Sequence, residues 1–403
     1  MPGKLIRKFL QLEAVGGIIL FCAALVAICF DNSRLAPIYE NLLAFPLSIH
    51  VGSFSLSKHL LEWVNDGLMV IFFLMVGLEI KREMISGELN SKAKIFLPLA
   101  AALGGMLCPA FIFWIINNNN ALAMRGWAIP TATDIAFSLG ILSLLGSRVP
   151  ISLKIFLTAL AIFDDLGAII IIAIFYTTNL SFISFAFAGI FLIILFLLNY
   201  FNIRALSPYL FVGFLLWLCV LNSGVHATLA GVALAFALPL KSNEQETSPA
   251  AYLMKLLHPW IVFFILPVFA FFNAGVSFAD VPPGIHNIFS PVMLGIALGL
   301  LVGKLVGVFG TTFLTIKLKF APMPAHSTWP QIFGIALVCG VGFTMSFFVG
   351  TLAYPEGLSS EPFQAWVRIG VILGSLASGL LGYLVLRFTT KNIRRPKSKQ
   401  IAA

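Results

Sequence analysis

Charged residues are scarce in this sequence, and their scarcity excludes most soluble folds. Only 10% of the 403 residues are charged, whereas 60% are hydrophobic and the mean hydropathy is +1.00. Soluble globular domains carry roughly 25% charged residues. Apolar runs of about 18 or more residues recur along the chain, which is typical of membrane-spanning helices, and the roughly 10-residue alternating segments of a transmembrane barrel do not appear. The sequence therefore predicts an all-α polytopic membrane protein.

Cysteine is also sparse, and its spacing excludes a disulfide framework. The cysteines are scattered through apolar segments without paired or metal-ligand spacing. We expect them to act as small residues in helix packing. No histidine or cysteine stands close in sequence to the buried acids described below, so we expect no transition metal and no cofactor. The five cysteines are Cys22, Cys29, Cys108, Cys219 and Cys339.

The first residues are similar to a signal peptide, because Lys4, Arg7 and Lys8 precede an apolar stretch that ends near Phe30. The stretch is long for such a peptide, and no small-x-small cleavage site closes it. We therefore expect an uncleaved first span, within a single integral-membrane domain that covers residues 1–403.

Hydrophobic runs predict about twelve transmembrane helices. A short polar break at Asn222-Ser223-Gly224 joins the seventh and eighth runs into a tight helical hairpin. The runs lie near 12–30, 63–82, 95–116, 124–146, 151–175, 181–199, 207–222, 224–240, 259–275, 291–316, 330–352 and 366–387.

Lysine and arginine are distributed unevenly among the predicted loops. Of the 25 basic residues, 20 fall in the termini or in loops on the same side as the termini. By the positive-inside rule, both termini are cytoplasmic. The basic tail at 388–403 is then a signal for topology and for anionic lipids, so the net charge of +9 does not indicate a nucleic-acid partner.

Residues 45–58, between the first two spans, alternate in polarity around the turn residues Gly52-Ser53. This pattern predicts a short β-hairpin on the periplasmic side. An isolated hairpin is only marginally stable, so we expect it to pair with another element.

Four ionisable side chains interrupt the apolar runs: Asp134, Asp164, Asp165 and Lys304. Each costs roughly 2.5–3.5 kcal/mol at the centre of a membrane helix, which indicates a functional role. A purely structural ion pair would explain one aspartate with Lys304, but it leaves two further acids without a partner.

Two spans contain residues that disfavour helix. The fourth reads AIPTATDIAF and the eleventh reads ALVCGVGFTMSFF. Interrupted segments at matching positions in two halves of a chain point to the binding site of a transporter. Here they are the middle helices of spans 3–5 and 10–12, which start on opposite sides of the membrane and so predict an inverted repeat.

The spacing of small residues adds a prediction about packing. In the tenth span Gly295, Gly299, Gly303 and Gly307 recur every four residues, a pattern that lets helices approach closely. Lys304 is therefore expected on a helix that is pressed tightly against its neighbours.

Adjacent residues on a helix point about 100° apart, so Asp164 and Asp165 cannot chelate one ion symmetrically. One carboxylate can face an ion cavity while the other meets a second helix, such as the one that bears Lys304. Thr133, Asp134 and unwound carbonyls could complete a shell of oxygens for a hard cation. A carboxylate that binds either a proton or a cation, in a cavity that opens alternately to each side, couples the two fluxes.

Several long motifs resemble the NhaA-type sodium/proton antiporters over nearly the whole chain. They are NDGLMVIFFLMVGLEIKRE (65–83), PTATDIAF (130–137), ALAIFDDLGAIIIIAIFY (159–176), NSGVHATLAG (222–231), LVGKLVG (301–307) and GVGFTMSFF (340–348). The resemblance implies a bacterial inner-membrane protein with twelve helices, of which the fourth and eleventh cross as broken helices, and a homodimer joined partly through the hairpin. It also implies electrogenic export of Na⁺ or Li⁺ in exchange for external H⁺, activated at alkaline pH.

The same resemblance implies roles for individual residues. Asp165 and Asp164 would form the core of the ion site together with Thr133. Asp164 would also be the partner of Lys304 in proton transfer, and Asp134 would balance the charges of the half-helix ends.

For pH regulation, the resemblance points to Glu79, Arg82 and Glu83 at the end of the second span and to His258 near the start of the ninth. His226, in NSGVHATLAG, is a further candidate, although a packed, hydrogen-bonded histidine at a helix start is an equally good interpretation. A Glu-His pair is expected just before His258, but Met254 and Lys255 stand there. We therefore expect a pH profile that is shifted or flattened.

Other classes of protein fit these residues less well. An intramembrane aspartyl protease needs one acid on each of two helices and a GxGD motif, and Ser223 with His226 lacks a GxSG context. No catalytic residue, and hence no enzyme, is predicted. A cation channel would have little use for a buried lysine. A related symporter for organic anions would need more polar contacts than the sequence offers. These two transport functions remain the alternatives.

Overall fold

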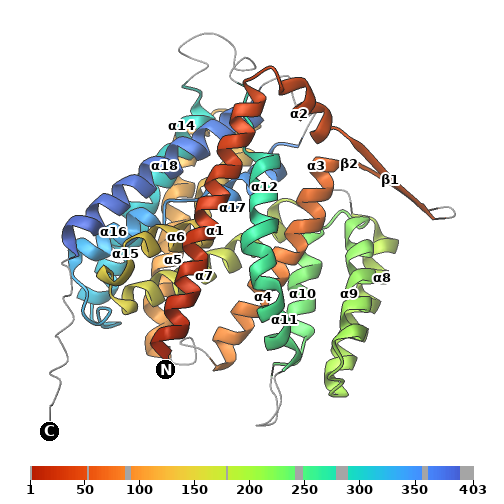
Figure 1. The fold of residues 1–403 in the computed structure, drawn as a ribbon, viewed down its shortest axis with the longest axis horizontal. Coiled ribbons are helices and arrows are strands. Elements are labelled where there is room, and N and C mark those ends of the chain that lie inside the picture. Colours follow the sequence, from red (N-terminus) through yellow and green to blue (C-terminus); the bar gives the residue numbers. More distant parts are fainter. Residues whose placement is uncertain are drawn as a thin grey trace, which may run out of the picture.

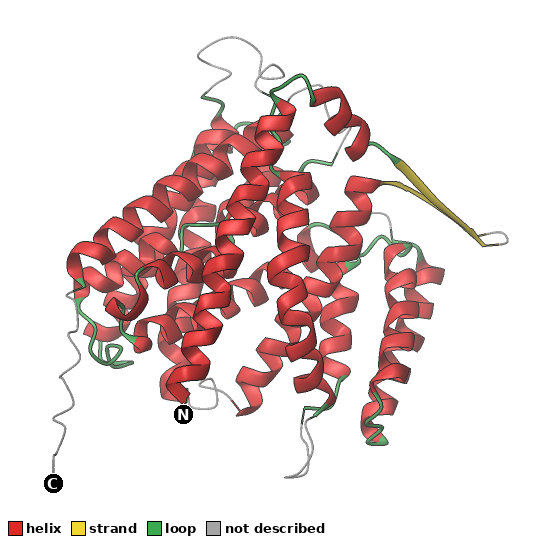
Figure 2. Cartoon of the chain, in the orientation of Figure 1, coloured by secondary structure: helices red, strands yellow, loops and turns green. Residues whose placement is uncertain are grey.

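The computed structural model describes residues 2–51, 54–86, 92–177, 180–240, 248–277, 289–355 and 362–390. Helices make up most of these residues (Figure 2), as the composition predicts for a polytopic membrane protein. The side chains of residues 2–14, 49–51, 54–56, 86, 92–94 and 147 are outside this description.

The described helices are bounded as follows, in chain order. They are α1 (Pro2–Asp31), α2 (Ala36–Leu43), α3 (Leu60–Trp63), η1 (Val64–Leu68), α4 (Met69–Ser86), α5 (Lys92–Asn117), η3 (Ala123–Thr131), α6 (Ile135–Leu144), η4 (Gly146–Arg148), α7 (Ile151–Phe175), α8 (Phe182–Tyr200), α9 (Leu206–Leu221), α10 (Thr228–Ala237), α11 (Pro249–Trp260), η5 (Ile261–Ile265), α12 (Leu266–Asn273), α14 (Pro291–Leu298), η6 (Gly299–Gly303), α15 (Lys304–Lys317), α16 (Trp329–Val338), α17 (Phe343–Ala353) and α18 (Phe363–Thr389).

Seven continuous helical stretches among the described residues are long and apolar enough to cross a membrane, and three bent helix pairs bring this number to as many as ten. The shorter apolar helices α9 and α10 occupy the seventh and eighth predicted runs. Each of the twelve runs found in the sequence therefore has a helix, while the number of membrane crossings stays a prediction. The eighth helix begins at Thr228, later than predicted, because residues 222–227 form a loop.

The predicted hairpin is present as β1 (Pro46–Val51) and β2 (Phe54–His59), which pair antiparallel from Pro46 with His59 to Val51 with Phe54. It projects from one end of the helix bundle, and the start of α1 lies at the opposite end (Figure 1). We call these the hairpin end and the N-terminal end. The short helix α2 has no counterpart among the predicted spans. It connects α1 to the hairpin, and its axis is bent by 114° relative to that of α1.

The glycine stripe of the tenth span packs as predicted. A Cβ atom on Gly307 would lie 2.1 Å from the Gly104 carbonyl oxygen of α5, and one on Gly303 would lie 2.7 Å from Pro109 Cα. Only glycine allows backbones to approach this closely. The close contact between α15 and α5 holds Lys304 firmly at the centre of the bundle.

Three short π-helical segments, η1, η5 and η6, interrupt the long helices. No residue pattern in the sequence predicts these segments. A π-bulge adds a residue to one turn and so rotates the following side chains relative to those before it, often at a functional site. The segment η6 ends immediately before Lys304, so it sets the direction of that side chain.

Candidate ion-binding site

Two broken helices meet at the centre of the bundle. The first consists of η3 and α6, bent by 40°, and the second of α16 and α17, bent by 43°. Their breaks touch, because the Asp134 backbone N–H donates a hydrogen bond of 2.7 Å to the Val341 carbonyl. The interruptions predicted from AIPTATDIAF and ALVCGVGFTMSFF therefore lie next to each other in space.

Asp134 lies where two half-helices begin. Its Oδ1 accepts a bond of 2.9 Å from the Phe137 N–H of α6, and its Oδ2 accepts from the Thr344 N–H (3.0 Å) and hydroxyl (2.5 Å) of α17. The residue is 2% exposed. Unpaired N–H groups and the helix dipole make a helix start electropositive. One carboxylate thus caps two helix starts at once.

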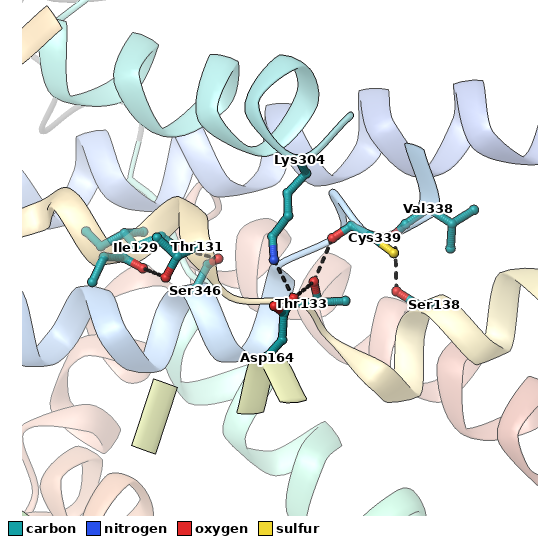
Figure 3. A network of polar contacts seen from close by, with 10 residues as sticks. Ile129, Thr131, Thr133, Ser138, Asp164, Lys304, Val338, Cys339 and Ser346 are labelled. Atoms are coloured by element: carbon teal, nitrogen blue, oxygen red, sulfur yellow. Dashed lines mark hydrogen bonds and ion pairs between the residues drawn. The ribbon is translucent and has the colours of Figure 1, made fainter. Parts of the chain in front are cut away.

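The other two half-helices, η3 and α16, end near the crossing in backbone carbonyl groups. Serine hydroxyls donate hydrogen bonds to these carbonyls. Ser346 donates to the Ile129 carbonyl at 2.8 Å, and Ser138 donates to the Val338 carbonyl at 3.2 Å. Each serine belongs to one broken helix and each carbonyl to the other (Figure 3). These bonds supply partners that the helix breaks remove, and so they hold the two broken helices together.

Lys304 reaches this crossing from α15 and forms an ion pair with Asp164 Oδ2 of α7 (Figure 3). Both side chains are fully buried. Thr133, at the break of the first broken helix, is also fully buried and bonds to the same carboxylate oxygen at 2.6 Å. The structure therefore brings together Thr133, Asp164 and Lys304, as the resemblance implies.

Thr133 has one hydroxyl hydrogen but two oxygen neighbours that can accept it. Besides Asp164 Oδ2, the Cys339 carbonyl oxygen of the second broken helix lies 2.8 Å from Thr133 Oγ1. A carbonyl can only accept, and an ionised carboxylate can only accept. Asp164 is ionised in its ion pair with Lys304, so Thr133 is the donor in both contacts. Its single hydroxyl hydrogen is therefore shared between the Asp164 carboxylate and the Cys339 carbonyl oxygen.

Asp165 differs from its neighbour, because its carboxylate has no hydrogen-bond partner within the described residues. It is 1% exposed, and neither of its carboxylate oxygens has a hydrogen-bond partner among the described residues. Asp164 Oδ1 is likewise unpartnered within the described part of the chain. A buried carboxylate without a partner is costly, so these three oxygens require a proton or a cation.

The chemistry of the donor set fits a hard monovalent cation. Oxygen groups gather near this doublet, namely the unpartnered Asp164 Oδ1, the Thr133 hydroxyl and the Cys339 carbonyl. Hard cations bind to such oxygen ligands. In the described part of the chain, no group of three or more histidine, cysteine, aspartate or glutamate side chains is arranged to bind a metal ion.

The residues predicted to sense pH fall into two separate places. Glu79, Arg82 and Glu83 lie on the last turns of α4, where Arg82 and Glu83 pair at 3.1 Å, and His258 lies on α11, which packs against α4 near the N-terminal end. His226 lies in the loop before α10, whose first turns pack on Val70 near the start of α4. The structure therefore does not bring the five predicted pH-sensing residues together in one place.

Known proteins match this chain over nearly its whole length. The family model for Na⁺/H⁺ antiporter 1 matches residues 7–386. A Pseudomonas putida protein named Na⁺/H⁺ antiporter NhaA is 50% identical over 97% of this chain and 99% of its own length. Relatives of the same name from Rhodospirillum rubrum and Bordetella parapertussis are each 52% identical, and they cover 97% and 95% of this chain and 99% and 96% of their own lengths.

The chain belongs to the Na⁺/H⁺ antiporter 1 family. The resemblance seen in the sequence motifs is thereby confirmed, and the family is one of secondary transporters rather than enzymes.

Some contacts in the antiporter site had no clear signal in the sequence. Thr344 was noticed only as part of an interrupted span, yet it binds Asp134 through both its N–H and its hydroxyl. The Cys339 carbonyl is a backbone group, so no pattern of side chains identifies it. Lys81 was not singled out either, although its ammonium donates to the Phe236 carbonyl at 2.6 Å and to the Leu238 carbonyl, at the end of α10. A helix C-terminus accepts such a cation.

Proposed function

We propose that this chain exports Na⁺ or Li⁺ from a bacterial cytoplasm in electrogenic exchange for external H⁺, and that pH regulates the exchange. Membership of the Na⁺/H⁺ antiporter 1 family supports sodium/proton exchange. The observation that carries the proposal is the buried, unpartnered carboxylate of Asp165 beside the Asp164–Lys304 ion pair. No cofactor is needed for this function.

Asp165 is the principal cation ligand in this proposal. Because its two oxygens lack partners among the described residues, the carboxylate can bind a proton or a cation but not both at once. Occupation by one excludes the other, and alternate opening to the two sides of the membrane then converts this competition into exchange. Asp164 Oδ1 supplies a second unpartnered carboxylate oxygen to the same ion.

Thr133 links the charge of Asp164 to the second broken helix. The Thr133 hydroxyl donates to Asp164 Oδ2 and to the Cys339 carbonyl oxygen. When Thr133 turns its hydrogen fully toward the Asp164 carboxylate, it frees the Cys339 carbonyl. A freed carbonyl is a suitable additional ligand for a cation. This rotation therefore adds an oxygen to the shell that the cation needs.

The ion pair accounts for the electrogenic character. Binding of a cation to Asp164 weakens the attraction that keeps Lys304 protonated, so Lys304 releases a proton in addition to the proton of Asp165. Two protons then exchange for one monovalent cation, and one net charge moves in each cycle. Asp134 stays charged throughout, because the two helix starts supply its partners.

The remaining expectations concern topology and assembly. We propose twelve spans with both termini in the cytoplasm, an inverted repeat of spans 3–5 and 10–12, and a periplasmic hairpin that pairs with its counterpart in a homodimer. The position of the hairpin, away from the bundle and opposite the start of α1, supports this arrangement (Figure 1). Glu79, Arg82, Glu83 and His258 would respond to cytoplasmic pH, His226 to pH at the hairpin end, and residues 388–403 would contact anionic lipid.

The test is exchange in proteoliposomes. Addition of Na⁺ or Li⁺ should dissipate an imposed proton gradient, with a current that depends on membrane potential. Asp165→Asn should abolish exchange, because an amide cannot alternate between a proton and a cation. Undiminished exchange by that variant would overturn the site assignment. Sodium flux without proton counter-movement would instead support the channel, and a requirement for an organic anion would support the symporter.

A further inference from the structure

A second buried polar group with an unused oxygen lies away from the acid doublet. Asn273, the last residue of α12, is 1% exposed, and its Nδ2 donates to the Phe269 carbonyl at 2.9 Å and to Asn65 Oδ1 at 2.8 Å. Both amide hydrogens are therefore used, and the two bonds fix which way the amide points. Its Oδ1 has no partner among the described residues.

An unpaired amide oxygen inside a membrane protein is unfavourable unless something binds it. Asn65 is only half-buried and lies in the π-helical segment η1, so a polar connection leads from Asn273 toward the surface. An amide oxygen has two lone pairs, so Asn65 Oδ1 can accept a further bond beside the one from Asn273. The neighbouring Asp66 is not available, because its side chain pairs with Lys58.

The amide pair has a definite position relative to the ion site. Thr344 lies at the crossing, and Phe348 follows it by one turn of α17. The Phe348 ring lies 6.3 Å from the Phe269 ring between centroids, and Phe269 precedes Asn273 by one turn of α12. Each four-residue step is about 6 Å along a helix. Asn273 is therefore about two turns beyond the crossing.

This direction leads toward the hairpin end. Just after α12, the Val276 carbonyl accepts a bond of 2.6 Å from Asn32, which follows the end of α1 that leads to the hairpin. Between the crossing and the amide pair lie three buried rings, since Phe73 also packs on Phe348 with centroids 5.4 Å apart. Phe73, Phe269 and Phe348 form what we call the aromatic cluster.

We propose that the amide oxygens of Asn273 and Asn65 form an outer relay site, which transiently binds a partly dehydrated monovalent cation between the aromatic cluster and the solution at the hairpin end. The inference rests on the proposed cation exchange. Amide oxygens are suitable ligands for hard cations. Because they are neutral, they bind the ion more weakly than the Asp165 carboxylate does and release it readily, as conduction between successive sites requires.

The deciding experiment measures the rate of sodium transport separately from the equilibrium affinity for Na⁺. We expect Asn273→Leu to slow radioactive sodium counterflow in proteoliposomes about tenfold, while the equilibrium affinity of purified protein for Na⁺ stays within about twofold of the wild type. Asn117 provides the matched control, because it ends α5 with the same arrangement. Its Nδ2 donates to the Phe113 and Pro291 carbonyls, and its Oδ1 is unpartnered among the described residues. Asn117→Leu should leave counterflow unchanged.

A second variant keeps the inference testable if the leucine variant does not fold. Asn273→Asp should bind a second Na⁺ per protomer at alkaline pH. Asn117→Asp should not, because Asn117 donates to two backbone carbonyls and has no second amide beside it comparable to Asn65. An Asn273→Leu protein with wild-type counterflow, or an Asn273→Asp protein with a single bound Na⁺, would overturn the relay site. Absence of exchange in the wild type would contradict the proposed function instead, so the two failures are distinguishable.

Discussion

Asp134 and Asp165 are both buried acids near the crossing of the broken helices, but their surroundings are opposite. Asp134 accepts three hydrogen bonds from the first turns of α6 and α17, whereas Asp165 accepts none from the described residues. A carboxylate with a full set of partners is a fixed charge that stabilises the fold. One without partners is free to exchange its ligand. Burial alone therefore does not distinguish the two acids, but hydrogen-bond satisfaction does.

Removal of Lys304 should give the largest change in stability. Lys304→Ala leaves Asp164 buried without its counter-charge, which should lower the free energy of unfolding by about 3–5 kcal/mol. Thermal unfolding in detergent, followed by tryptophan fluorescence, measures this. The double variant Lys304→Met with Asp164→Leu should recover most of the stability and none of the exchange. A double variant as unstable as Lys304→Ala would show that the ion pair is needed for packing rather than for transport.

The contrast between the two acids can be tested directly. Asp134→Ala removes the cap of two helices and should cost about 2–4 kcal/mol of stability. Asp165→Asn should not lower the free energy of unfolding, because no hydrogen bond among the described residues is lost and a neutral amide replaces a buried carboxyl group that lacks partners there. Thermal unfolding of both variants under the same conditions provides the comparison. Equal losses in the two variants would contradict the distinction between a fixed charge and an exchangeable one.

Competition for Asp165 predicts a particular pH dependence. As the pH falls through the range in which the carboxylate takes up its proton, the apparent KM for Na⁺ should rise about tenfold per pH unit for each competing proton. The maximal rate at saturating Na⁺ should stay constant over the same range, since sodium displaces the proton. Initial exchange rates at several pH values and Na⁺ concentrations separate the two parameters. A falling maximal rate with a constant KM would contradict direct competition.

Thr133 should give a smaller effect that depends on its hydroxyl. Thr133→Val removes the group shared by Asp164 and the Cys339 carbonyl and should raise the apparent KM for Na⁺ about fivefold to tenfold, equivalent to roughly 1 kcal/mol. Thr133→Ser keeps the hydroxyl and should restore nearly the wild-type KM and its pH dependence. If serine and valine behave alike in exchange assays, the methyl group matters and the hydrogen-bond switch is wrong.

Much of this architecture could be predicted because a lipid environment imposes simple rules on a sequence. A span needs a long apolar run, so helices were recognised at all twelve positions, and a buried charge is costly, so Lys304 and the three acids stood out. The glycine stripe at Gly303 and Gly307 likewise indicated close packing before any coordinates were known. The π-helical segment before Lys304 could not be predicted, because no residue type marks it.

The chain's own residues already specified a helical membrane protein, its two interruptions, and the acids and the lysine placed at its centre. These features follow from local free energies of transfer and from the helix period, both of which act along the chain. Only the tertiary structure decided that Asp134 is satisfied by Thr344, that Asp165 is left without a described partner, and that Asn273 points an unused oxygen beyond the aromatic cluster. Such differences depend on which groups from distant segments meet within about 3 Å, and a hydrogen bond is a property of that meeting rather than of either residue alone.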